Sequence, residues 1–318
     1  MKKIAVITSG GDAPGMNAAV RAVVRTCLNS KVEPYVVMDG YKGLVENNIK
    51  KVDRRFVSEV LNRGGTIIGT ARLKEFVEED VQQKAISNLK NLGIEGLVVV
   101  GGDGSFRGAI DLCKKGIKCI GVAGTIDNDI NSDGYTVGFD TALNTIVEAV
   151  DKIRDTSSSH HRCSIVEVMG RHCGDLALYS SIACGADILI DPNTKLNEEE
   201  MYKDIIRMKE EGRRHVLIIV SENVLDSVEL AKRIEEHTGF ETRANVFGHF
   251  QRGGVPTGMD RFRASVLGSE AVKCLLNGES DEMLYLSNQE LKKISLEEAT
   301  QKKVIKYKYL YEINKVIG

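Results

Sequence analysis

The chain has 318 residues, 42% of them hydrophobic and 28% charged, which is typical of a globular protein of about two domains. Forty-three lysines and arginines against 45 aspartates and glutamates leave a net charge of −2, whereas nucleic-acid and membrane-surface binders carry a basic excess. No apolar run approaches the ~20 residues that cross a bilayer. The apolar run in the opening segment MKKIAVITSGG is too short for a signal peptide.

Short aliphatic runs, each followed by a glycine-rich turn or a helical pattern, recur along the chain. Strands are predicted over residues 4–8, 97–100, 119–122, 164–168 and 215–220, and helices over 18–28, 109–114, a stretch ending at 183, and 225–237. Apolar strands that alternate with helices indicate parallel sheets with both faces covered. The predicted fold class is therefore α/β, Rossmann-like and in two lobes, with ligand sites at the carboxyl ends of the strands.

The seven cysteines show neither CxxC nor Cys/His ligand spacing. Scattered single thiols favour a reducing compartment and core packing over disulfides or a metal site. We therefore expect a cytoplasmic protein with neither a membrane nor a nucleic-acid partner.

Two acidic glycine turns follow predicted strands: GGD at residues 10–12 and GGDGS at 101–105. A glycine turn that opens a helix directs free N–H groups and the positive helix end at an anion. Asp103 would repel a bare phosphate but suits one that carries Mg²⁺. A dinucleotide turn or a merely tight strand–helix connection remains open, although the GxGxxG spacing is missed by one residue and no Walker lysine follows.

The segment TIDND at residues 125–129 places two carboxylates at the end of a buried strand. Buried carboxylates are costly unless they meet a cation or exchange a proton. If the segment is extended, Asp127 and Asp129 face the same side, so that one accepts a hydroxyl proton while the other helps to hold a metal. An Asx-type turn in which both side chains cap backbone groups is the alternative.

Five arginines lie at strand ends or glycine turns, a placement that suits a polyphosphate reaction because the guanidinium fork matches phosphate oxygens. They are Arg72, Arg162, Arg171, Arg243 and Arg252. Any one of them is more often a surface ion pair, but together they favour a phosphoryl-transfer site.

The chain resembles the ATP-dependent 6-phosphofructokinase family of the short bacterial type over nearly its whole length. The motifs that carry the resemblance are TSGGDAPGMNAA, NRGGT, GTAR, GGDGS, GTIDND, DTSSSH, VEVMGR, CGD, ETRA, GHFQRGG and DR. The last ~40 residues carry little of it. The resemblance implies the phosphofructokinase fold, a homotetramer, and transfer of phosphate from MgATP to the 1-hydroxyl of fructose 6-phosphate in glycolysis.

The resemblance also implies roles for individual residues. Asp127 would take the hydroxyl proton, with Thr125 and Asp129 beside it; Arg72, Arg171 and the Gly11 amide would stabilise the transferring phosphoryl group. Asp103 would hold Mg²⁺. The implied ATP site comprises Gly11, Tyr41, Arg72, Leu73, Gly102, Asp103, Gly104, Ser105 and Gly108. The implied substrate site comprises Thr125, Ile126, Asp127, Arg162, Met169, Gly170, Arg171, Glu222, Arg243, His249, Phe250, Gln251 and Arg252, with Arg162 and Arg243 reaching in from a neighbouring subunit.

Members of the family also bind effectors between subunits, where ADP activates and phosphoenolpyruvate inhibits. The matching residues are Arg21, Arg25, Arg54, Arg154, Gly185, Asp187, Arg213, Arg214 and His215. Arg21 and Arg25 are one helical turn apart and would clamp one phosphate. Glu211 stands where near relatives often carry lysine, so we expect effector control to be weaker than in those relatives.

The donor is predicted from two glycines. Pyrophosphate-dependent relatives typically carry Asp and Lys where this chain has Gly104 and Gly124, and an Asp at the first position would intrude on the nucleotide. Glycine at both positions favours ATP. Leu73 and Val77, where relatives often show Phe and Arg, are expected to broaden the choice among nucleotides.

The predicted larger, nucleotide-binding lobe comprises residues 1–138 and 251–301, and the smaller, sugar-phosphate lobe comprises 139–250 and 302–318. A pyrophosphate-dependent phosphofructokinase and a non-catalytic nucleotide sensor are the alternatives in function, although a sensor would lose the base and Asp127 is present. A dinucleotide oxidoreductase would need GxGxxG, and NAD kinases and lipid kinases lack the GTIDND and MGR segments in this order.

Overall fold

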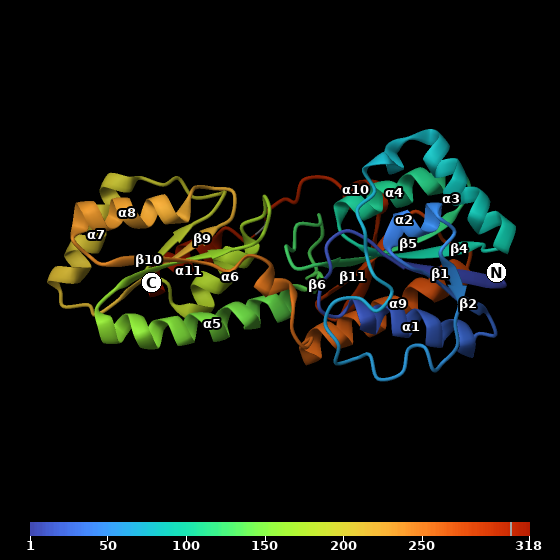
Figure 1. Ribbon diagram of the computed structural model, residues 1–318, viewed down its shortest axis with the longest axis horizontal. Coiled ribbons are helices and arrows are strands. Elements are labelled where there is room, and N and C mark those ends of the chain that lie inside the picture. The colour runs from blue at the N-terminus through green and yellow to red at the C-terminus, as the bar shows by residue number, and fades with distance from the viewer. Residues whose placement is uncertain (306) are drawn as a thin grey trace. The chain divides into compact units, whose positions relative to one another are not determined.

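The computed structural model describes residues 1–305 and 307–318, and its α/β architecture confirms the predicted fold class (Figure 1). The described chain forms two compact units. Unit 1 comprises Met1–Ile126, Ile130–Thr141 and Arg252–Lys303, and unit 2 comprises Asp127–Asp129, Ala142–Gln251 and Val304–Gly318. The assignment of ATP and sugar phosphate to separate lobes with the boundaries given above stays a prediction.

Unit 1 contains a mostly parallel sheet with the order β12-β11-β5-β4-β1-β2-β3, in which β6 pairs with β5. Its strands are β1 (Lys3–Thr8), β2 (Glu33–Val37), β3 (Ile49–Lys51), β4 (Gly96–Gly101), β5 (Lys118–Thr125), β6 (Val137–Gly138), β11 (Glu282–Ser287) and β12 (Glu290–Ser295). The edge strands β3 and β12 are antiparallel to their neighbours, and β2, β1, β4, β5 and β11 run parallel. The carboxyl ends of β1 and β4 therefore lie at the same edge.

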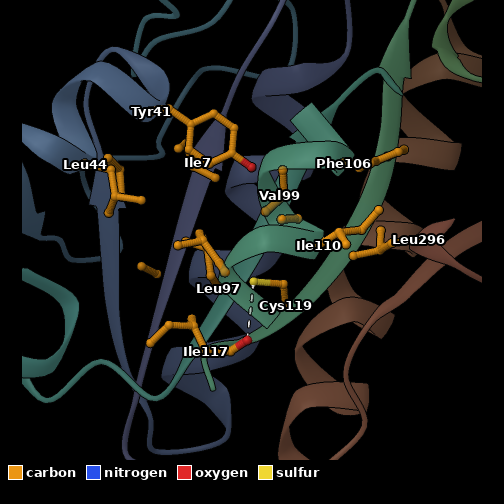
Figure 2. Close-up of a cluster of buried hydrophobic side chains, with 14 of the residues drawn as sticks. Ile7, Tyr41, Leu44, Leu97, Val99, Phe106, Ile110, Ile117, Cys119 and Leu296 are labelled. Atoms are coloured by element: carbon orange, nitrogen blue, oxygen red, sulfur yellow. Dashed lines mark hydrogen bonds between the residues drawn. The ribbon is translucent and has the colours of Figure 1, made fainter. Parts of the chain in front are cut away.

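Helices cover both faces of this sheet (Figure 1). One face carries α1 (Met16–Asn29) and α9 (Gly258–Leu276); the other carries α2 (Gly40–Val45), α3 (Glu79–Leu92), α4 (Asp103–Lys114) and α10 (Leu296–Ala299), with the 3₁₀ turn η1 (Lys74–Val77) before α3. Figure 2 shows part of the core beneath α4, where Phe106 and Ile110 of the helix meet Leu97 and Val99 of β4. This packing fixes α4 on the sheet.

Unit 2 contains a parallel sheet with the order β10-β7-β9-β8. Its strands are β7 (Cys163–Val168), β8 (Ile188–Ile190), β9 (Val216–Ser221) and β10 (Thr242–Val246); its helical segments are α5 (Phe139–His160, which begins in unit 1), α6 (Asp175–Cys184), α7 (Glu198–Glu210), α8 (Ser227–Thr238), α11 (Tyr309–Ile317) and most of the 3₁₀ segment η2 (Gly248–Arg252). Helices α7 and α8 pack together over one face, and α6, with α11 against it, packs on the other (Figure 1).

Five predicted strands coincide with β1, β4, β5, β7 and β9 to within three residues at each end. The predicted helix over residues 109–114 is the C-terminal half of α4, which already begins at Asp103, inside the predicted GGDGS turn, after its N-cap Gly102. Short edge strands such as β3, with the sequence IKK, carry no apolar run and were not predicted. In the described part of the chain no helix is both long and apolar enough to cross a membrane.

Candidate functional site

The two glycine turns of unit 1 lie side by side because β1 pairs directly with β4. Beyond the paired strands, the Ser9 amide donates to the Val100 carbonyl at 3.0 Å. Gly10 has a φ of 85°, a left-handed conformation that favours glycine. At Gly101 a side-chain Cβ would lie 2.4 Å from the Ser105 hydroxyl oxygen and 2.6 Å from the Ser9 carbonyl oxygen, so only glycine lets the turns approach this closely.

The N-terminus of α4 faces open space. A Cβ built on Gly104 would meet no atom within 4 Å, and Gly104 itself is exposed. Asp103, the first residue of the helix, keeps 30% of its side chain exposed and lies 3.6 Å from the Arg107 guanidinium. The amides and the positive end of the dipole at a helix N-terminus favour an anion at this place, and the Asp103 carboxylate lies at the same helix end.

The GTAR segment is held against the first glycine turn. The Thr70 hydroxyl donates to the Gly10 carbonyl at 2.8 Å, and the Thr8 hydroxyl donates to the Gly69 carbonyl at 2.8 Å. Arg72 follows with an exposed side chain, and Leu73 is half-buried against the core. The structure thus brings Arg72 to the same sheet edge as the Gly10–Gly11 turn.

Arg252, predicted for the sugar phosphate, lies in unit 1 against the first glycine turn. Its guanidinium donates to the Asp12 carbonyl at 3.3 Å. A Cβ on Gly11 would lie 2.4 Å from the Arg252 Nη1 atom, so the glycine makes room for this arginine.

Tyr41 and Gly108, both predicted to line the ATP site, pack against each other in the core (Figure 2 shows Tyr41 at its edge). A Cβ on Gly108 would lie 2.7 Å from the Tyr41 ring, which stacks on Phe76 at 4.2 Å between centroids. The Tyr41 hydroxyl donates to the Ser105 carbonyl at 2.6 Å, and burial raises its pKa well above the usual value. Tyr41 therefore buttresses the first turns of α4, and its contact with a nucleotide stays a prediction.

The segment after β5 is not extended, so the premise that put Asp127 and Asp129 on one side is wrong. The backbone bends at residues 126 and 127, and Asn128 takes a left-handed φ of 51°. Thr125, the last residue of β5, belongs to unit 1, as does Ile126, whereas residues 127–129 belong to unit 2. Ile126 is fully buried and Asp127 is 2% exposed.

Asp129 meets a cation, as the cost of burying a carboxylate requires. The Arg171 Nη1 atom lies 3.0 Å from the Asp129 Oδ2 atom. The backbone of the MGR turn is held by Glu222, whose Oε1 atom accepts the Gly170 and Arg171 amides at 3.1 and 2.7 Å. The Glu222 carboxylate thus stabilises the backbone of the MGR turn. Within this turn Arg171 has a left-handed φ of 55°, and its side chain pairs with Asp129.

The GHFQR segment supplies one buried and two exposed side chains. Gln251 is fully buried and its Oε1 atom accepts the Met169 amide at 3.1 Å. His249 is exposed rather than packed in the core, and Phe250 keeps 65% of its surface exposed. Gln251 therefore ties this segment to the end of β7.

Arg162 and Arg243 converge on one carboxylate of unit 2. Their guanidinium groups lie 2.9 and 2.6 Å from the same Oε1 atom of Glu241. The hydrogen bond from Arg162, reinforced by Arg243, holds the pKa of Glu241 below its usual range. Both arginines stay 30% or more exposed at the side chain, so the structure brings them together on the surface.

The predicted effector residues form two groups, one in each unit. In unit 1, burial and the neighbouring charges of Arg25 and Arg54 lower the pKa of Arg21, so these three guanidinium groups are close. In unit 2, Asp187 pairs with Arg213 and accepts the Leu217 amide at 2.8 Å.

His215 lies beside this pair in unit 2, since burial and the charge of Arg154 lower its pKa while Asp187 opposes the shift. Gly185 ends α6 in a left-handed conformation, and Arg214 is exposed.

Three hydrogen-bonded polar residues, Asn128 within the 127–129 segment and Asp175 and Tyr307 beyond it, have no role predicted from the sequence. The Asn128 amide group donates to Asp175 Oδ2 at 2.7 Å, and the Tyr307 hydroxyl donates to Asp175 Oδ1. The signals were the Asn inside GTIDND and the Asp of CGD; Tyr307 lies in the tail where no motif directs attention.

A metal would depend on Asp103 and on ligand oxygens. In residues 1–305 and 307–318 no three side chains of His, Cys, Asp or Glu cluster as metal ligands. One partly exposed carboxylate at a helix N-terminus fits Mg²⁺, which takes one or two carboxylates plus substrate phosphates and water.

Comparison with known proteins gives one consistent result. The phosphofructokinase family profile matches residues 3–275. The chain is 54% identical over 291 residues to the ATP-dependent 6-phosphofructokinase of Photobacterium profundum, covering 92% of this chain and 91% of that protein. It is 53% identical over 299 residues to an ATP-dependent 6-phosphofructokinase of Clostridium perfringens, covering 94% of each. The phosphofructokinase structure from Saccharomyces cerevisiae superposes with a TM-score of 0.88 at 38% identity, covering 94% of this chain and 45% of that one.

Proposed function

The chain belongs to the phosphofructokinase family, and from that premise we propose that it transfers the terminal phosphoryl group of MgATP to the 1-hydroxyl of D-fructose 6-phosphate. The products are fructose 1,6-bisphosphate and ADP, in the cytoplasm and as a step of glycolysis. The observation that carries the proposal is the 54% identity over 92% of the chain to an ATP-dependent 6-phosphofructokinase.

The catalytic base in this proposal is Asp127. Its carboxylate accepts the proton of the attacking sugar hydroxyl, and general base catalysis of this kind contributes about 10²–10⁴-fold. The 2% exposure of Asp127 supports the role, because a carboxylate kept away from water is a stronger base toward a bound hydroxyl.

The charge of the transferring phosphoryl group is met by Arg171, Arg72 and the Gly11 amide. Preorganised donors of this kind supply most of the catalysis in phosphoryl transfer. Asp129 fixes the Arg171 guanidinium at 3.0 Å, so the donor is oriented before substrate arrives. Asp103 would hold Mg²⁺, which neutralises charge on the ATP phosphates when bound.

Fructose 6-phosphate is proposed to bind the substrate-site residues predicted from the sequence, which include Arg252 of unit 1 and the MGR turn of unit 2. Arg252 provides a guanidinium, while Glu222 and Gln251 hold the MGR turn by its backbone. Arg162 and Arg243, which share Glu241 on the surface of unit 2, are assigned to the substrate of a neighbouring subunit in a homotetramer.

The donor experiment compares ATP with pyrophosphate. Product formation from fructose 6-phosphate and Mg²⁺ is measured with each donor in separate assays. Turnover with ATP alone is expected, since Gly104 leaves the space beside the helix end open. Turnover with pyrophosphate alone would contradict the donor assignment while the acceptor chemistry stands. No turnover with either donor would favour a nucleotide sensor or a different acceptor sugar.

The shared site and the regulation are tested separately. An Asp127→Ser subunit mixed with an Arg243→Ser subunit regains activity if the sites are completed across an interface; no recovery in verified mixed tetramers contradicts it. ADP is expected to activate and phosphoenolpyruvate to inhibit through the two effector groups, weakly because of Glu211. Strong phosphoenolpyruvate inhibition that Glu211→Lys leaves unchanged would contradict the weak control.

A further inference from the structure

We propose that Tyr307, in the C-terminal segment, is a positioning residue for the catalytic base, acting through Asp175 and Asn128. The Tyr307 hydroxyl donates to one carboxylate oxygen of Asp175, and the Asn128 amide donates to the other at 2.7 Å. Asn128 directly follows Asp127 in the chain. The inference rests on the proposed function because it concerns the residue assigned there as the base.

Asn128 is where the segment needs support. It holds a left-handed φ of 51° in a bend, and it is 2% exposed. Non-glycine residues adopt this conformation rarely and keep it only where the surroundings impose it. The Asn128 side chain bonds to Asp175, and the Asn128 carbonyl accepts the Cys173 thiol at 3.7 Å. The orientation of the neighbouring Asp127 carboxylate follows from this backbone.

Asp175 is itself fixed by its place in the fold. It is the first residue of α6, 2% exposed, and its two oxygens are divided between Asn128 and Tyr307. Burial first, and the Asp175 charge second, raise the pKa of Tyr307 far above its usual value. The phenol therefore remains protonated at every working pH and is a permanent donor to the carboxylate.

The C-terminal segment offers a matched pair of tyrosines. Tyr311 also donates its hydroxyl to a buried carboxylate, Asp191 Oδ2, at 2.7 Å, and accepts from the Asn193 amide at 2.9 Å. Asp191 caps the turn at Asn193 and Thr194, whereas Asp175 accepts the hydrogen bond from Asn128. Both tyrosines anchor the same tail, but Tyr307 donates to the carboxylate that holds Asn128, whereas Tyr311 donates to Asp191.

The experiment replaces each hydroxyl by hydrogen. Tyr307→Phe keeps the ring, which packs edge-on against Tyr179 at 6.1 Å between centroids. We expect its kcat to fall about 5–50-fold, since small misplacements of a reacting group cost up to ~100-fold, with KM for ATP and fructose 6-phosphate within about twofold of the wild type. Tyr311→Phe is expected to lose stability to a similar extent and to keep its kcat within about twofold.

A second measurement does not depend on activity. Hydrogen–deuterium exchange of peptides spanning residues 126–130 is expected to accelerate in Tyr307→Phe and in Asp175→Asn, and to match the wild type in Tyr311→Phe. Unchanged exchange in Tyr307→Phe, or equal losses of kcat in both tyrosine variants, overturns the proposal. If the wild type fails to phosphorylate fructose 6-phosphate, the proposed function falls, and the exchange data alone decide whether Tyr307 orders the segment.

Discussion

The two units hold their predicted functional groups by different means. In unit 1 the edge proposed to bind phosphate is made of backbone: the Gly10 and Gly101 turns approach within contact distances that a side chain would block, and Gly104 is open. In unit 2 the groups are side chains held by other side chains, as Arg171 is by Asp129. A substitution in the first region therefore changes access or packing, and one in the second changes the chemistry.

The largest effect on kcat is expected from Asp127→Ser, which removes the carboxylate of the proposed base and leaves the glycine turns of unit 1 unchanged. We expect kcat to fall by about 10²–10⁴-fold, while the thermal unfolding temperature changes little. Steady-state kinetics and circular dichroism measure the two quantities. Asp80→Ser is the control, since that side chain is 72% exposed on the surface of α3. Activity that survives Asp127→Ser would show that another group is the base.

Access to the α4 N-terminus is expected to matter next. Gly104→Asp adds a carboxylate where the ATP phosphates are proposed to bind, and like charges at ~4 Å repel by about 1–4 kcal/mol between water and a protein surface. We therefore expect kcat/KM for ATP to fall at least about tenfold, with unchanged stability because no atom lies within 4 Å of the new Cβ.

Gly258→Asp is the matched control for this prediction. Gly258 is the first residue of α9, is exposed, and likewise has no atom within 4 Å of a built Cβ. The same substitution at a second open helix end is expected to leave ATP kinetics unchanged. Equal effects of both substitutions would indicate a general charge effect and contradict the assignment of the α4 end.

Packing behind the same helix separates a structural from a binding role. Gly108→Ala drives a methyl group to 2.7 Å from the Tyr41 ring, and overpacking of a core costs about 1–3 kcal/mol of unfolding free energy. Gly104→Ala in the same helix is expected to change that free energy by less than about 1 kcal/mol. Urea denaturation compares them. A Gly108→Ala protein of normal stability but weak ATP binding would instead place Tyr41 and Gly108 in the nucleotide site.

The backbone turns of unit 1 are easier to predict from the sequence than the side-chain contacts of unit 2. Glycine turns such as GGDGS can be predicted from the sequence, because close approach of two backbone segments requires glycine. The strands before these turns can also be predicted, because they are continuous apolar runs. The start of α4 was misplaced because glycines argue against a helix, yet this one begins at Asp103. The bend at Asn128 and its support by Asp175 and Tyr307 depend on contacts across 47 and 132 residues of sequence, which no local pattern contains.

Protonation of His215 is expected to give the smallest and most local effect, again in the region built from side chains. Burial and the charge of Arg154 hold the pKa of His215 in the folded protein below the usual 6.5. The neutral imidazole therefore contributes to the free energy of unfolding above pH 6.5. This contribution is lost as the pH falls from 6.5 through the lowered pKa. A bound phosphate would offset the cationic surroundings and raise the pKa again. Proton NMR titration, with His215→Gln to assign the signal, should show an upward shift on adding ADP. No shift under saturating ADP would place the effector phosphates away from His215, Arg154 and Arg213, because a dianion beside them must stabilise the charged imidazole.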